Sequence, residues 1–195
     1  MSKRTGPWLA AAAGLLIAGS ASAQQAADTF RDGGDGAKVH ASGFVCPQRI
    51  GEFERDAVGE ADPERQSDFC AYSALNGVYG TVVLMPVSGA YDPKASLASQ
   101  FGETETTGGR KLAENTVALK GLPLSVYTRT YRTAGAEGME YRTLFAAAAI
   151  RNWGVELTME YASPRDAQLE EGFVDAVYSA AQREIGVASP AAAAK

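Results

Sequence analysis

The sharpest alternation of apolar and polar residues in the chain covers residues 153–161. One face of this segment carries Trp153, Val155, Leu157, Met159 and Tyr161, and the other carries Gly154, Glu156, Thr158 and Glu160. A period of two residues is typical of a half-buried β-strand. Apolar runs at 117–119, 124–133 and 139–150, with short turns at 135–138 and 151–152, predict that this strand closes an antiparallel meander. We expect a register in which Ala149 opposes Trp153 and Phe145 opposes Leu157.

Helical periodicity replaces this alternation after residue 162. Ser163 is a capping residue, Pro164 suits the first helical position, and Asp166 completes a capping-box pattern. Apolar side chains then recur at helical spacing and form one face over nearly five turns: Leu169, Phe173, Val174, Val177, Tyr178, Ala181 and Ile185. We expect this face to pack against the alternating face of the meander.

The first half of the chain predicts four short strands and one helix. The strands are expected at 43–46, 50–56, 69–74 and 79–86, and Asn76-Gly77 between the last two is a strong hairpin signal. Asp92-Pro93 predicts the start of a short helix over 92–102, which Gly102 ends. Residues 103–113 are polar and contain two glycines, and we expect a mobile loop there.

This order of elements predicts an α+β domain, with an antiparallel sheet and two packed helices, over residues 40–186. Residues 24–39 are expected to be a flexible leader and residues 187–195 a disordered tail. In element order and size, residues 43–185 resemble the PsbP-like α/β/α sandwich superfamily. The resemblance rests on no diagnostic motif, so it implies no functional residue. It implies a non-enzymatic domain that docks onto a larger envelope assembly.

The first 23 residues have the pattern of a secretory signal peptide. Lys3 and Arg4 precede an apolar run over 8–17, and Ala21-Ser22-Ala23 forms a small-x-small cleavage pattern before Gln24. The apolar run is shorter than the roughly 20 residues that a membrane-spanning helix needs. We therefore expect export to a bacterial periplasm, with no stable membrane insertion; the alternative is an uncleaved N-terminal anchor.

Net charge and cysteine content bear on the partners of the chain and on its cysteine chemistry. Removal of Lys3 and Arg4 with the signal peptide takes the net charge from −5 to −7, and a negative chain has no general electrostatic attraction to nucleic acid. Cys46 and Cys70 are the only cysteines, and an even count in an oxidising compartment predicts a disulfide rather than a redox pair.

The sequence lacks a recognisable catalytic or metal-binding motif. His40 is the only histidine and stands at the edge of the leader, so we expect a solvated bystander. Two cysteines and one histidine, widely separated, do not predict a zinc site. The glycines at 33–36 and 108–109 lack the spacing of a phosphate-binding loop. Glu156 and Glu160 are too far apart along a strand to act as a glycosidase pair, and we expect them on a solvated face. No cofactor is predicted.

One group of residues remains as a candidate binding surface. Tyr127, Arg129 and Tyr131 alternate on one face of the strand expected at 124–133, and we expect Arg142 on the same outer face, edged by Glu156 or Glu160. Tyrosine and arginine together suit protein partners, sugars or anionic small molecules. The alternative is that the helix over 92–102 covers this face and that the acids pair with the arginines structurally.

Two functions follow as predictions. The first is an exported binding or accessory protein, non-enzymatic, that contacts an envelope protein partner through Tyr127, Arg129, Tyr131 and Arg142. The second is a small-ligand-binding protein or weak hydrolase with a pocket near 103–113, lined by Arg110, Lys111 and the same tyrosines. An inhibitor of a lysozyme or a protease fits an exported disulfide-bonded domain too, although no residue argues for it. Oligomeric state is not predicted.

Overall fold

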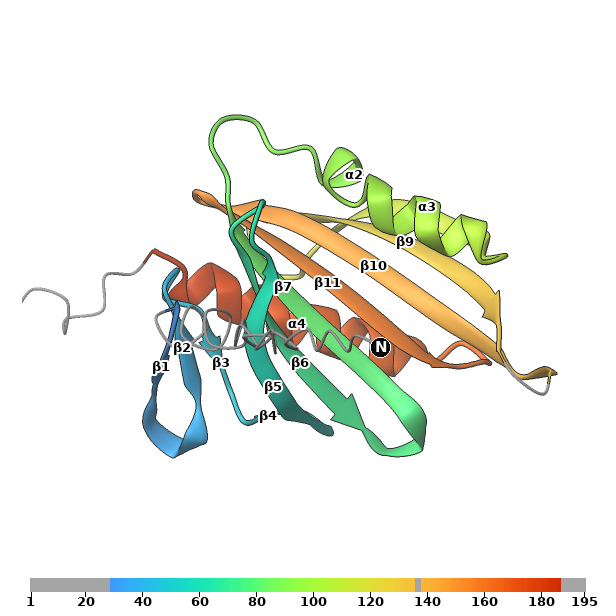
Figure 1. Cartoon of the computed structure of the whole chain (residues 1–195), viewed down its shortest axis with the longest axis horizontal. Helices are drawn as coiled ribbons and strands as arrows, with labels where there is room; N and C mark the ends of the chain where they lie inside the picture. Colours follow the sequence, from blue (N-terminus) through green and yellow to red (C-terminus); the bar gives the residue numbers. More distant parts are fainter. Residues whose placement is uncertain (1–28, 136–137, 187–195) are drawn as a thin grey trace, which may run out of the picture.

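An antiparallel sheet of eight strands dominates the computed structural model, which describes residues 29–135 and 138–186. Its strand order is β4-β5-β6-β7-β11-β10-β9-β8, and a separate small sheet has the order β1-β2-β3 (Figure 1). The signal peptide, residues 24–28 of the leader and the tail at 187–195 lie outside the described residues. The strands are β1 Phe30–Asp32, β2 Lys38–His40, β3 Val45–Cys46, β4 Arg49–Ile50, β5 Phe53–Asp62, β6 Ser67–Ala74, β7 Val78–Pro86, β8 Arg110–Ala118, β9 Ser125–Ala134, β10 Glu140–Ile150 and β11 Trp153–Ala162.

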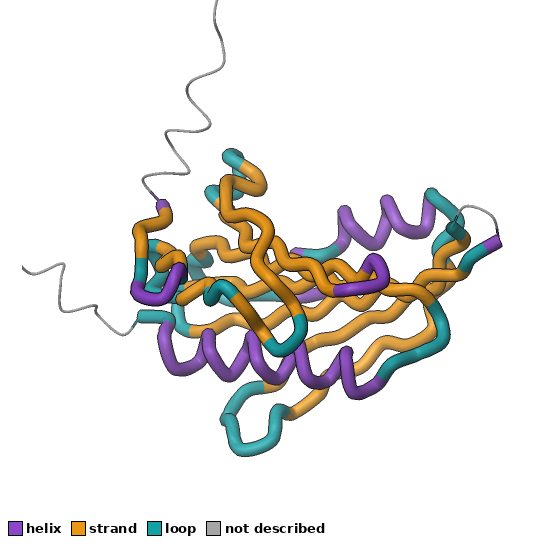
Figure 2. Tube along the Cα trace, turned by 90° about the horizontal axis from the view of Figure 1, so that it is seen from below, coloured by secondary structure: helices purple, strands orange, loops and turns teal. Residues whose placement is uncertain are grey.

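Helices cover the two faces of the large sheet. The short helices α2 (Pro93–Ser96) and α3 (Ala98–Thr106) lie on one face, and α4 (Ala167–Glu184) crosses the other (Figures 1 and 2). The predicted α+β class with an antiparallel sheet is therefore confirmed. Strands account for far more of the domain than the two-helix sandwich expectation implied, because the small sheet and a long β8 add to it.

The predicted meander is confirmed, but its register is shifted by one residue. Ile150 opposes Trp153, Ala149 opposes Gly154, and Ala146 opposes Leu157. The turn contains only Arg151 and Asn152, and Arg151 has φ of 57°, which a tight two-residue hairpin turn requires. The expected pairing of Ala149 with Trp153 would have needed a third turn residue. A slip of one residue moves side chains to the opposite face of a sheet, and this affects the candidate site.

The main core lies between α4 and the large sheet. Phe173, Val177, Tyr178 and Ala181 of α4 are buried against it, as the helical periodicity predicts. Gly80 allows this close approach, because a Cβ there would lie 2.7 Å from the Phe173 ring. The helix begins three residues later than expected: Asp166 is the N-cap, and its side chain accepts a hydrogen bond from the Leu169 N–H at 2.9 Å.

The segment expected to be a flexible leader forms part of the structure from Phe30 onward. β1 and β2 pair as a hairpin, and Phe30 and His40 are both buried. The His40 ring centroid lies 5.1 Å from that of Phe30 and 5.1 Å from that of Trp153. The expectation of a solvated His40 is therefore wrong. The polar, glycine-rich composition did not predict this hairpin, because a single aromatic side chain packs it against the end of the sheet.

The expected loop at 103–113 is also not a loop. Gly102 does not end the helix, since α3 continues to Thr106, and β8 begins at Arg110. Only residues 107–109 connect the two elements. The helix tolerates an interior glycine at a cost of about 1 kcal/mol relative to alanine, which packing of Phe101 offsets.

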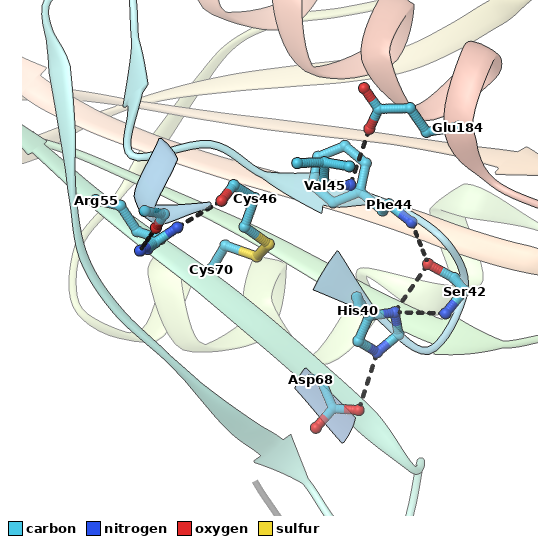
Figure 3. The surroundings of a disulfide bond; sticks show 10 residues. His40, Ser42, Phe44, Val45, Cys46, Arg55, Asp68, Cys70 and Glu184 are labelled. Atoms are coloured by element: carbon cyan, nitrogen blue, oxygen red, sulfur yellow. Dashed lines mark hydrogen bonds and ion pairs between the residues drawn. A yellow bond between two sulfur atoms is a disulfide. The ribbon is translucent and has the colours of Figure 1, made fainter. Parts of the chain in front are cut away.

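The predicted disulfide and hairpin are both present. Cys46 and Cys70 are bonded, with their Cα atoms 6.3 Å apart, and the bond joins β3 of the small sheet to β6 of the large one (Figure 3). β6 and β7 form the hairpin expected around residues 76–77, joined by the short 3-10 turn Leu75–Gly77. Gly77 has φ of 70°, which glycine adopts without strain.

Loss of the disulfide should destabilise the domain measurably. The bond closes a sequence separation of 24 residues. In the chain-entropy model, such a loop contributes about 3 kcal/mol to the free energy of unfolding. We expect urea unfolding with and without a reductant to show a loss of this size, and the variant C46A/C70A to show no further response to the reductant. An unfolding midpoint that reductant leaves unchanged in the wild type would contradict the prediction.

Candidate functional site

The three residues of the predicted surface strand lie beneath α3 rather than on an open face. Tyr127, Arg129 and Tyr131 are all buried, and they pack with Leu97 and Phe101 of the α2–α3 segment. The structure has the alternative arrangement, in which the helix near 92–102 covers this face. A binding role for the three side chains stays a prediction, and the arrangement described here does not expose them.

Arg129 is held by several partners within this buried group. Its guanidinium lies 3.9 Å from the centre of the Phe101 ring and donates to Glu114 Oε2 at 2.9 Å and to the Tyr131 hydroxyl at 3.0 Å. The Tyr131 hydroxyl donates to Glu105 Oε1 at 2.7 Å. Hydrogen bonds to Tyr131 and Glu114 raise the pKa of Arg129 against the effect of burial. The acidic partner is thus Glu114 of β8, not Glu156 or Glu160 as expected.

Glu156 is the centre of a second polar group on the same face. Its side chain is almost fully buried, contrary to the expected solvated face. Glu156 Oε1 accepts from Arg65 Nη2 at 2.9 Å, from the Ser96 hydroxyl and from the Tyr91 hydroxyl, and Oε2 accepts from Gln100 Nε2 at 3.3 Å. Burial raises the pKa of Tyr91 well above its ordinary value. The group joins α2, α3 and the loop before them to the sheet.

A serine, a histidine and an aspartate meet at the end of the sheet (Figure 3). His40 Nδ1 lies 2.8 Å from Ser42 Oγ and accepts the Ser42 backbone N–H at 3.1 Å, which leaves Nε2–H to donate to Asp68 Oδ2 at 3.2 Å. The residue types and the order of contacts are those of a hydrolase triad. Sequence reasoning missed this group because residues 28 positions apart in the chain meet only in the fold.

The Ser42–His40–Asp68 group is largely enclosed by the fold and makes structural hydrogen bonds. Ser42 and His40 are both buried, and Ser42 Oγ also accepts the Phe44 N–H at 3.2 Å, which fixes the turn before β3. A nucleophile needs room for a substrate carbonyl beside it. The nearest cavity, of about 190 Å³, is lined by Asp68 and by Thr29, Glu60, Pro63, Gln66 and Ser67, but not by Ser42 or His40.

A groove of about 480 Å³ opens on the face of the sheet that carries α4. It lies where α4 leaves the last strands of the sheet uncovered. Its volume is within the range of known ligand sites. It combines apolar with polar and charged side chains, which come from β8, β9, β10, α4 and the residues next to them. The lining residues are Leu112, Ala113, Asn115, Val117, Leu119, Thr128, Thr130, Arg142, Leu144, Arg165, Glu170, Glu171, Val174 and Asp175.

Arg142 lines this groove, on the opposite face of the sheet from Arg129. The pairing of Arg142 with Arg132, and of Phe145 with Arg129, places it there, so the expectation of one shared outer face is wrong. Its Nε lies 3.5 Å from Glu170 Oε1, and Arg165 Nε donates to Glu170 Oε2 at 2.9 Å. The Tyr161 hydroxyl also donates to Glu170 Oε1, at 2.6 Å. Glu170 therefore engages both groove arginines.

The groove only partly matches the pocket predicted near 103–113. Leu112 and Ala113 of that segment line it, but Arg110 and Lys111 do not. Lys111 instead lies on the other side of β8 and binds Glu114 at 3.0 Å. A second cavity, of about 410 Å³, lies between the β4–β5 turn and α4 and is lined by Ile50, Phe53, Leu169 and Phe173 among others.

Neither a metal site nor a membrane-spanning helix is found in the described part of the chain. Residues 29–135 and 138–186 contain no group of three histidine, cysteine or carboxylate side chains placed to hold a metal ion. Over the same ranges, none of the helices has the length and apolar character needed to cross a bilayer.

Comparison with known proteins places this chain in no family. No family model matches it, and no curated protein matches its sequence. Among solved structures, it is similar to LpqN, which is described as involved in cell envelope biogenesis of Mycobacterium tuberculosis; the two are 12% identical over 66% of this chain and 76% of that chain, with a TM-score of 0.35. A similarity at this level supports no functional conclusion. The resemblance to PsbP-like proteins stays a prediction.

His40 should make folding stability depend on pH. Burial lowers the pKa of His40 below its ordinary value of 6.5, although the Asp68 carboxylate opposes this effect. The unfolded chain then binds a proton more readily than the folded one as the pH falls through about 6.5, so stability should decrease on acidification in that window. His40→Gln, whose amide can still accept and donate, should flatten the dependence between pH 7.5 and 5.

The measurement is the free energy of unfolding in urea at several pH values. Because the chain has one histidine, the difference between the wild-type and variant curves isolates its contribution from that of the carboxylates. Parallel curves for the two proteins would show that His40 does not titrate differently on folding.

The Glu156 group should be needed to hold the α2–α3 segment. Glu156→Ala leaves Arg65, Ser96 and Gln100 without their shared acceptor, and loss of one partner of a buried ion pair costs about 3 kcal/mol. Glu160→Ala is the matched control, since Glu160 lies on the same strand face but is exposed. Its effect should stay below about 1 kcal/mol. Hydrogen exchange of α3 amides should rise in the first variant only; equal effects would contradict the assignment.

Proposed function

We propose that this chain is an exported, non-enzymatic accessory protein of the cell envelope, which binds a protein partner in the groove between α4 and strands β8–β10. The observation that carries the proposal is the groove itself. It combines an open apolar floor with charged side chains at its rim, the composition typical of binding sites. The export signal read from residues 1–23 supports an envelope location.

The polar groups elsewhere in the domain support a binding role over catalysis. The carboxylates of Glu114, Glu156 and Asp68 are each engaged by partners from neighbouring elements. A general acid or base must reach a substrate proton, and Glu156 is buried beneath the α2–α3 segment. The groove, in contrast, displays apolar surface and two arginines that a carboxylate already engages. Such a site is suited to recognising the shape of a partner rather than to carrying out a chemical reaction.

Exposed apolar side chains support a contact surface at β8. Leu112 and Val117 line the groove and are 43% and 44% exposed. Their burial by a partner would contribute about 25 cal/mol for each Å² of apolar surface removed from water. The sequence-based candidate Arg142 lies in the same groove and keeps a place in the proposal, whereas Tyr127, Arg129 and Tyr131 lie on the far side of the sheet.

A small apolar ligand is the second candidate for this groove. The volume of about 480 Å³ falls within the range that small-molecule sites occupy. The two candidates share the site and differ in the occupant, so a single experiment separates them.

The experiment places a photo-crosslinking amino acid, p-benzoylphenylalanine, at Val117 of the full chain expressed in its native host. A control variant of the same chain carries p-benzoylphenylalanine at Leu75 instead. Leu75 is 83% exposed and lies in the turn between β6 and β7. A third variant carries p-benzoylphenylalanine at Val117 together with Ala113→Trp, whose large side chain fills the groove. We expect one protein adduct at position 117, identified by mass spectrometry, absent at 75 and reduced about tenfold by the groove-filling change.

Each other result counts against the proposal. An adduct of a few hundred daltons at position 117 would favour the small-ligand candidate instead. Adducts of equal yield at 117 and 75, or a protein adduct that Ala113→Trp does not reduce, would show that the groove is not the binding site. Absence of any adduct at 117 would contradict a partner there.

A further inference from the structure

The strand β8 forms the long open edge of the large sheet. It pairs with β9 alone, and no other described strand lies beside it. Eight of its nine residues are exposed, with Glu114 as the intermediate one. The opposite edge is β4, which has only two residues. An exposed long edge is a template for a further strand, and natural proteins usually blunt such edges.

The outward-pointing backbone groups of β8 follow from its pairing with β9. Leu119 N–H donates to the Leu124 carbonyl at 3.1 Å, which marks this pair as a hydrogen-bonded one. Hydrogen-bonded pairs alternate along an antiparallel ladder, so Val117 and Asn115 also direct their backbone groups to β9. The N–H and carbonyl groups of Thr116 and Ala118 therefore point away from the sheet. They are free to bond an added strand.

The straight part of this edge coincides with the groove. A bulge interrupts the β8–β9 register between Lys111 and Ala113, and regular pairing runs from there to Ala118. Side chains of Ala113, Asn115 and Val117 line the groove from this regular part. In neighbouring strands, residues that lie opposite each other point their side chains to the same face of the sheet. Every second side chain of an added strand would therefore project over the groove. Val174 of α4 forms the opposite wall.

The charges at the wall of α4 favour a basic side chain in the occupant. Both groove arginines are engaged by Glu170. Asp175 also lines the groove, is exposed, and has no ion-pair partner among residues 29–135 and 138–186. Glu171 beside it keeps only a contact of 3.7 Å with the flexible Arg165. The unbalanced charge of the groove is therefore negative, like that of the whole chain.

We propose that β8 receives an extended segment of the partner protein as an added strand, whose groove-facing side chains are apolar with one basic residue opposite Asp175. This inference rests on the proposed function, because it names the chemistry of the partner that occupies the groove. Main-chain hydrogen bonds along 113–118 supply affinity, and the groove and Asp175 supply selectivity.

The first test removes one backbone donor of the edge. Thr116→Pro deletes an outward N–H without touching the β9 ladder, at a position where edge strands tolerate proline. Thr116→Ala is the matched control, since it changes the side chain and keeps the N–H. The probe is a nine-residue peptide in which threonine alternates with groove-facing valine, valine, lysine and valine. NMR titration should give binding to the wild type and to Thr116→Ala, and binding weaker by about tenfold or more to Thr116→Pro.

The second test reverses the charge and leaves the backbone unchanged. A peptide with glutamate in place of lysine should bind the wild type about tenfold more weakly than the lysine peptide. Asp175→Lys should reverse this preference. Asp175 is exposed on α4, so the variant should fold even if Thr116→Pro does not. Equal affinity of the two peptides for the wild type and for Asp175→Lys would overturn the charge assignment.

The remaining outcomes also decide the proposal. Peptide binding that Thr116→Pro leaves unchanged, in a folded variant, would overturn strand addition. A dimer of the wild type that Thr116→Pro converts to a monomer would assign the edge to a second copy of this chain and overturn the partner peptide. If Thr116→Pro abolishes peptide binding but keeps the crosslink at position 117, the groove stands as the proposed site and strand addition by the partner is wrong.

Discussion

One helix is too narrow to cover one face of an eight-stranded sheet, and much of this structure follows from that shortage. Eight strands spaced about 4.8 Å apart make a sheet about 34 Å wide, whereas a helix with its side chains is about 10 Å across. α4 packs against β10 and β11 and also contacts β3. The small sheet, with Phe30 and Phe44 in the same core, adds cover on the side of β5 and β6. No described element does the same for β8 and β9, and the groove lies there.

The other face is covered by different means. The α2–α3 segment contributes only two fully buried apolar side chains, Leu97 and Phe101, so apolar burial alone gives it a small interface. Polar contacts supply the rest: Glu156 binds Ser96 and Gln100, and Tyr131 binds Glu105. Lys94 adds an ion pair with Glu114 at 2.9 Å. The tyrosines and Arg129 that attract attention in the sequence are therefore used to attach a short helix to the sheet.

The sequence predicted the elements whose pattern is local and failed where distant contacts decide. The alternation at 153–161, the apolar face of α4, the hairpin at 76–77 and the cysteine pair each depend on neighbouring residues or on a simple count, and each is confirmed. Most of β8 was not predicted, because its exposed residues show almost no alternation of apolar and polar positions; only its end falls within the strand expected at 117–119. The structure of residues 30–40 was not predicted, because one buried aromatic side chain orders them and their overall composition does not indicate it.

The candidate site was harder to predict than the fold because it depends on register. The β9–β10 register, with Arg142 opposite Arg132 and Phe145 opposite Arg129, places Arg142 and Arg129 on opposite faces of the sheet. The two-residue turn between β10 and β11 in turn places Arg142 on the face opposite Glu156 and Glu160. The aromatic-and-arginine surface expected from the sequence therefore does not form. Of the two glutamates expected on a solvated face, Glu160 is exposed but Glu156 is buried, since it pairs with Arg65 from a segment 91 residues away.

The proposed role in recognition rests on which polar groups the fold engages and which it leaves open. Catalysis requires at least one reactive group that its neighbours leave accessible. Here Ser42, His40 and Glu156 bond to neighbours inside the fold and lie out of reach of a substrate. What the fold leaves open is backbone along one strand edge, an apolar groove beside it and the carboxylate of Asp175. These groups can form hydrogen bonds, bury surface and select charge, and the extended partner segment that we propose would use all three at once.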